Sequence, residues 1–151
     1  MHWFRRDGEP VARPVADPDP ADDPGVLLAE AATFARYVNA SAGRLPGDAV
    51  VTAREIGDVL REVIGTARSL DIYTAVTVTG LLTDHLPTTL RTFLTVGSAG
   101  RAAADALREQ LDSLLHEAVS LREAARARDA DALATQGNFL RTKFSNSDLD
   151  L

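Results

Sequence analysis

Few side chains in this sequence could do acid–base or metal chemistry, and their spacing matches no metal motif. Three histidines are present, and two have an acidic neighbour, in Asp84-His85 and His116-Glu117. A helical zinc-protease site needs a second histidine four residues after the first, but position 120 is a serine. We therefore predict no metal ligand.

The pair Asp84-His85 allows two interpretations, an acid–base pair or a helix boundary. Pro87 follows two residues later, and proline is common in the first turn of a helix, behind a polar capping residue. We favour the boundary, with Asp84 as the cap and His85 at the surface. Cysteine is absent, and no glycine pattern fits a phosphate-binding loop. The sequence thus predicts no catalytic residue and no cofactor.

The charge balance bears on possible partners. Sixteen basic and 22 acidic residues give a net charge of −6, which argues against nucleic acid, because phosphate binding needs clustered positive charge. No apolar run reaches the length of a signal segment or a membrane helix, so we expect a cytoplasmic location. We expect a protein partner or self-association and no nucleic acid, we regard membrane contact as the less favoured alternative, and the sequence identifies no small-molecule substrate.

Apolar residues recur every three or four positions after residue 25, which predicts an all-α fold. We predict a compact bundle of five to six helices. They cover residues 26–42, 52–69 (behind the capping pattern Thr52-Ala53-Arg54-Glu55), two parts of 71–96 separated by Pro87, 101–128, and about 130–145 behind Asp129 or Asp131. The clearest stripe is Leu107, Leu111, Leu114, Ala118, Leu121 and Ala125.

The stretch 71–96 is predicted to be the centre of the fold. Ile72, Tyr73 and Val76 share one helical side, and the other sides are apolar as well, so this helix should be buried all round. The alternating β-branched residues of 74–79 also fit a strand. We prefer a helix, because no other stretch supplies a strand to pair with it.

Residues 1–25 form a predicted disordered arm before a helical domain of residues 26–151. The arm is rich in proline and aspartate and cannot bury enough apolar surface to fold. It begins with Trp3, Phe4, Arg5 and Arg6, a candidate peg for a membrane interface or a partner groove. The alternative is a chain end without a role.

Two further candidate contacts lie within the domain. Thr88, Thr92 and Thr95 form one ridge of small, uncharged residues, which suits a half-buried contact with the same chain, a second copy or a partner. A threonine-rich surface without a role is the alternative. On the last helix, Phe139 projects away from a predicted inner face of Leu133, Ala134, Gly137, Leu140 and Phe144.

The stretch Asp84-His85-Leu86-Pro87-Thr88-Thr89-Leu90, followed by Phe93-Leu94, resembles a segment of the XpaC-like family. That family is labelled 5-bromo-4-chloroindolyl phosphate hydrolysis protein, and its members have a similar Leu-Pro-x-Thr-Leu turn between helices. The resemblance covers residues 45–145 in helix order. It implies an all-helical bacterial domain in envelope or toxic-anion stress, and it transfers no catalytic residue.

Three functional hypotheses follow. The first, which we favour because catalytic motifs are missing, is a non-catalytic helical interaction module or adaptor. The second is a hydrolase of small phosphate esters, which the family label alone implies. The third is a peripheral membrane protein that binds through the residues at 3–6.

Overall fold

The computed structural model describes residues 23–66, 70–96 and 100–149, and all its regular elements are helical. They are α1 (Pro24–Ser41), a 3₁₀ turn (Ala42–Arg44), α2 (Gly47–Thr66), α3 (Ile72–Gly80), a π-helical turn (Leu81–His85), α4 (Leu86–Val96) and α5 (Gly100–Leu149). The all-α class is confirmed. The predicted arm lies outside the described residues, except that α1 already begins at Pro24, with Asp23 as its N-cap.

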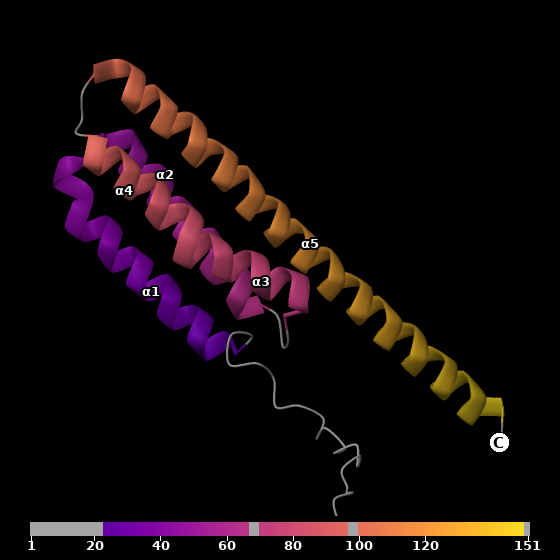
Figure 1. Cartoon of the computed structure of the whole chain (residues 1–151). Coiled ribbons are helices and arrows are strands. Elements are labelled where there is room, and N and C mark those ends of the chain that lie inside the picture. The colour runs from indigo at the N-terminus through magenta and orange to yellow at the C-terminus, as the bar shows by residue number, and fades with distance from the viewer. Residues whose placement is uncertain (1–22, 67–69, 97–99, 150–151) are drawn as a thin grey trace, which may run out of the picture.

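Helices α3 and α4 form one continuous rod, because the π-helical turn carries the chain from one into the other (Figure 1). Leu86 N–H donates to the carbonyl of Leu81, five residues back. This wider turn brings the chain into α4 with Pro87 as its second residue, where a missing N–H is tolerated. The predicted break at Pro87 is therefore wrong.

Asp84 lies inside this π turn rather than ahead of a new helix, so its predicted capping role is also wrong. Its carboxylate accepts a hydrogen bond of 3.3 Å from the Thr88 hydroxyl. His85 is exposed, as predicted.

Helix α5 is a single helix of 50 residues, where two helices were predicted. At 1.5 Å per residue it spans about 75 Å. Asp129 and Asp131 lie within it and begin no new helix. The described residues thus form four helical rods, α1, α2, the α3–α4 rod and α5, and the predicted count of five to six helices is not confirmed.

Helix α2 begins at Gly47, five residues before the predicted start. The capping pattern at 52–55 lies inside the helix, because Pro46 and Gly47 already provide the boundary. Asp48 in the first turn accepts the Ala49 N–H at 2.9 Å.

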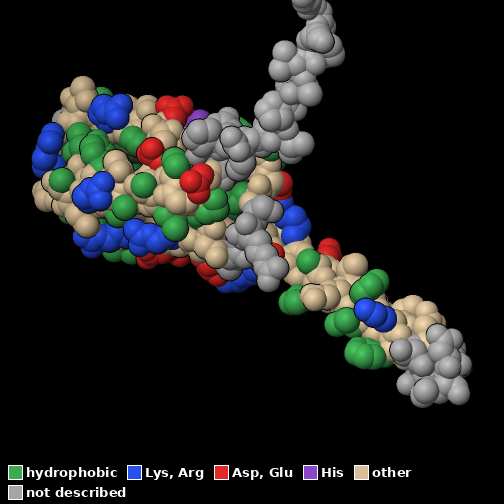
Figure 2. Space-filling model, turned by 90° about the horizontal axis from the view of Figure 1, so that it is seen from below, with side chains coloured by type: hydrophobic (Ala, Val, Ile, Leu, Met, Phe, Trp, Pro, Cys, Tyr) green, Lys and Arg blue, Asp and Glu red, His purple; other side chains and the backbone are tan. Residues whose placement is uncertain are grey.

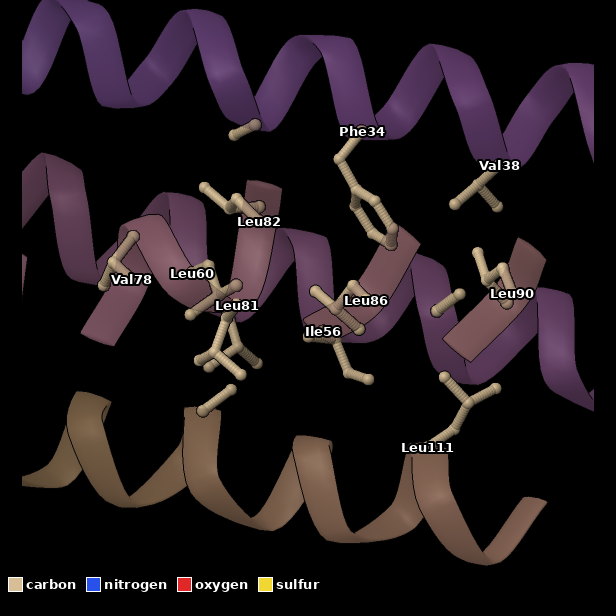
Figure 3. Close-up of a cluster of buried hydrophobic side chains, with 14 of the residues drawn as sticks. Phe34, Val38, Ile56, Leu60, Val78, Leu81, Leu82, Leu86, Leu90 and Leu111 are labelled. Carbon is tan, nitrogen blue, oxygen red and sulfur yellow. The ribbon is translucent and has the colours of Figure 1, made fainter. Parts of the chain in front are cut away.

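The core lies between α1 on one side and α5 on the other, with α2 and the α3–α4 rod between them (Figure 3). Its largest fully buried side chains come from all four rods. They include Leu27 and Val38 from α1, Ile56, Leu60, Val63 and Ile64 from α2, Leu81, Leu86 and Leu90 from the rod, and Leu111 from α5. The spacing of apolar residues predicted nearly all of these positions.

Helix α3 is buried on one side only. Ala75 and Val78 lie in the core, but Ile72 and Tyr73 are 73% and 75% exposed, and Val76 is exposed too. The prediction of burial all round is wrong, because α3 lies at the edge of the bundle and its outer side meets no other rod. Residues 74–79 are helical, as preferred. Within the described chain, no helix is long and apolar enough to cross a membrane.

Candidate interaction surfaces

Helix α5 extends well beyond the other helices (Figures 1 and 2). Its last core residue is Ala125, and from Arg126 to Asn146 every residue is exposed except Gly137, which is partly exposed. We call residues 129–149 the projecting segment. At 1.5 Å per residue this segment is about 30 Å long.

The projecting segment carries four large apolar side chains in the open. Leu133, Phe139 and Phe144 are 69%, 66% and 67% exposed, and Leu140 is 43% exposed. The predicted inner face of this part of the chain is therefore not part of the core. Helical periodicity groups these apolar residues on one side of the helix, but it carries no information about which element, if any, covers that side.

Leu133, Gly137, Leu140 and Phe144 are four, three and four residues apart, so they form one line along α5, which we call the projecting stripe. Phe139 is exposed, but it lies about a third of a turn away from this line. The stripe has the spacing of a seam that packs against one other helix.

Arginines hold the first half of α5 to the bundle. Arg108 pairs with Asp48 at 2.6 Å, near the starts of α5 and α2. Near the end of α2, Glu62 pairs with Arg122 at 3.3 Å and also with Arg126. The order of these pairs shows that α2 and α5 run parallel.

Among the described residues, Arg128 is the last residue of α5 whose side chain pairs with another rod of the bundle. Its guanidinium pairs with the Asp71 carboxylate and donates to the Thr74 hydroxyl at 3.1 Å, both at the start of α3. No inter-rod ion pair or hydrogen bond among the described residues involves α5 after this point.

The Glu62 pairs predict a loss of stability in acid. The hydrogen bond from Arg126 holds the pKa of Glu62 below its usual range, and Arg108 does the same for the pKa of Asp48. A carboxyl group whose pKa is lower in the folded state than in the unfolded state stabilises the folded protein. This stabilisation is complete above the unfolded-state pKa, which is about 4, and it is lost as the pH falls through the folded-state pKa. We expect Glu62→Gln to flatten the decline of the urea midpoint between pH 5 and about 2.5.

Glu117→Gln, at an exposed carboxylate on α5, is the control for that titration. It should leave the decline as in the wild type. Equal slopes for all three proteins would show that the Glu62 pairs do not contribute to stability.

The threonine ridge lies on the outer side of α4. Thr88, Thr92 and Thr95 are all exposed, and the Thr95 hydroxyl donates to the Arg91 carbonyl at 2.8 Å. A shallow hollow of about 220 Å³ runs along the ridge. The alternative of a half-buried contact with another helix of the same chain is therefore wrong for the described residues, while contact with a second copy or a partner stays a prediction.

Thr92→Glu tests this placement. We expect the free energy of unfolding to change by less than about 0.5 kcal/mol, as is usual for an exposed substitution, in a urea titration followed by circular dichroism. A loss of more than about 1 kcal/mol would mean that the ridge packs against its own chain.

Among the described residues, no three His, Cys, Asp or Glu side chains lie close enough to hold a metal ion. The candidate peg of Trp3, Phe4, Arg5 and Arg6 lies outside the described residues. Comparison with protein families, curated proteins and solved structures finds no match to this chain. The resemblance of residues 84–94 to the XpaC-like family therefore stays a prediction.

Proposed function

We propose that this chain is a non-catalytic helical interaction module that binds another protein helix through its projecting segment. The observation that supports this is the projecting stripe, an apolar line on the part of α5 that packs against no other helix of the described residues. Burial of an amphipathic face supplies most of the stability of helices in proteins, and the projecting segment has no such burial among the described residues. Contiguous exposed apolar side chains commonly mark such contacts.

The threonine ridge gives the module a second surface, as an adaptor requires. The ridge lies on α4, beside the beginning of α5, whereas the projecting segment is the other end of α5 (Figure 1). Two partners bound at these places would not compete for the same surface. The stripe is the stronger of the two surfaces, because it exposes leucine and phenylalanine rather than threonine.

Affinity capture from extracts of the source cells tests the proposal. Three full-length baits are compared: the wild type, Leu140→Glu on the stripe, and Thr142→Glu, which lies about half a turn from Leu140 on the same helix. We expect the wild type and Thr142→Glu to retain the same cellular proteins. We expect Leu140→Glu to lose those proteins. Identical captures with all three baits would refute binding through the stripe.

A further inference from the structure

We propose that the partner of the projecting stripe is the same segment of a second copy of this chain, paired antiparallel. This inference rests on the proposed function and names its partner. Three observations support it: the position of the stripe relative to α2, the distribution of charge along the segment, and the glycine in the stripe.

The stripe continues the exposed edge of α5 that borders α2. Arg126 reaches Glu62 of α2, and Leu133 lies seven residues after Arg126, close to two full turns along the same line. Helix α2 ends at Thr66, only four residues after Glu62. Beyond that point no helix of the described residues lies along this edge of α5, so a helix placed past the end of α2 against this edge would cover the stripe.

The charges of the segment favour a second copy in the antiparallel direction. Over residues 129–146 the acidic side chains are Asp129 and Asp131, and the basic ones are Arg141 and Lys143. Antiparallel pairing brings the acidic start of each segment to the basic part of the other, whereas parallel pairing puts like charges side by side. Asp129 and Lys143 are symmetric about position 136 and lie on the same side of the stripe, so they can pair, whereas Asp131 lies about half a turn away from the stripe.

Gly137 lies next to this centre and on the stripe. A Cβ atom at Gly137 would meet nothing within 4 Å, so no contact among the described residues requires a glycine there. In the middle of a helix it costs about 1 kcal/mol relative to alanine. Close approach of a second helix at the two-fold axis accounts for this residue, because a glycine lets the leucines of the partner's stripe pack against the backbone.

The geometry leaves room for residues 127–145 of the two copies to pair about position 136, because residue 145 then lies beside residue 127 of the other copy, just past the pair of Arg126 with Glu62 of α2. In an antiparallel arrangement the two bundles lie at opposite ends of the paired segments, about 30 Å apart along the axis. The projecting segment of each copy then packs along α5 of the other copy, just past the part of that α5 that packs against α2. The pairing is isologous and closed, as a two-fold dimer requires.

Sedimentation velocity of the purified full-length chain tests the pairing. We expect the wild type and Thr142→Glu to reach twice the mass of one chain as the concentration is raised, and Leu140→Glu to stay at the mass of one chain. Thr92→Glu, on the threonine ridge, should behave as the wild type. A wild-type chain that stays monomeric up to hundreds of micromolar would overturn the inference.

Single cysteines test the direction, because the chain has no cysteine of its own. We expect Gln136→Cys, next to the two-fold axis, to cross-link to its own copy with a short bis-maleimide. Ala130→Cys should not, because the two positions 130 would lie about 20 Å apart. An equal mixture of Ala130→Cys and Lys143→Cys should give the mixed cross-link. Strong cross-linking of Ala130→Cys to itself would show parallel pairing and contradict the proposal.

These experiments distinguish a failure of the dimer proposal from a failure of the proposed interaction function. A monomeric chain that still captures a cellular protein through Leu140 overturns the second copy as partner, and the interaction module stands. A monomeric chain whose captures do not depend on Leu140 overturns both. A dimer that Leu140→Glu leaves intact places the self-contact elsewhere and also refutes this inference.

Discussion

Replacing Leu111 by alanine should lower the free energy of unfolding by about 2–5 kcal/mol, the range found for leucine truncations in packed cores. Leu111 is fully buried on α5 and faces α2 and the α3–α4 rod (Figure 3). We prefer it to Leu114, the middle of the predicted stripe, because Leu114 is only partly buried. A urea titration at low protein concentration measures the effect, with the slope of the transition as a check on two-state behaviour.

The matched control is the same substitution further along the same helix. Leu133→Ala removes an equal side chain from the projecting stripe, where 69% of the residue is exposed. We expect a change of less than about 0.5 kcal/mol in the dilute chain. A loss at Leu133 as large as the loss at Leu111 would mean that the projecting segment folds back on the bundle in solution.

Asp71→Ala should give the second largest effect, a loss of about 1–2 kcal/mol. Asp71 is the N-cap of α3 and accepts the Thr74 N–H at 2.7 Å, and loss of such a cap typically costs about 1 kcal/mol. The same carboxylate pairs with Arg128, so the substitution also removes the last anchor of α5, an exposed pair that adds at most about 1 kcal/mol.

Asp71→Asn separates these two contributions. Asparagine keeps an oxygen that can cap the helix but lacks the charge that holds Arg128. We expect it to recover more than half of the stability that alanine loses. If asparagine were as destabilising as alanine, the pair with Arg128 rather than the cap would be the main contribution.

The sequence predicted the fold class and most of the core, because the spacing of buried leucines and isoleucines on α1, α2 and α5 follows one face of each helix. It did not predict the π turn. Asp84 and Pro87 together are typical of a helix boundary, and only the backbone shows that one wider turn carries the chain past the proline. The start of α2 was also missed, since Thr52 and Glu55 fit a cap as well as they fit a helix interior.

The candidate surfaces were harder to predict. The threonine ridge and Phe139 are exposed, but in the projecting segment every side of the helix is exposed, so the predicted contact at Phe139 stays a prediction. Leu133, Leu140 and Phe144 were assigned to the core, although they lie outside it. Periodicity cannot distinguish a face that packs against its own chain from one that packs against a partner, because both contacts require the same apolar spacing.

The central claim is that the projecting stripe is a contact surface, and photo-cross-linking in the source cells tests it most directly. The full-length chain carries p-benzoylphenylalanine in place of Phe144, on the stripe, or in place of Thr142, about half a turn away on the same helix. The account predicts a discrete cross-linked product from position 144 and none from position 142. Absence of a product at position 144, or the same products at both positions, would contradict it.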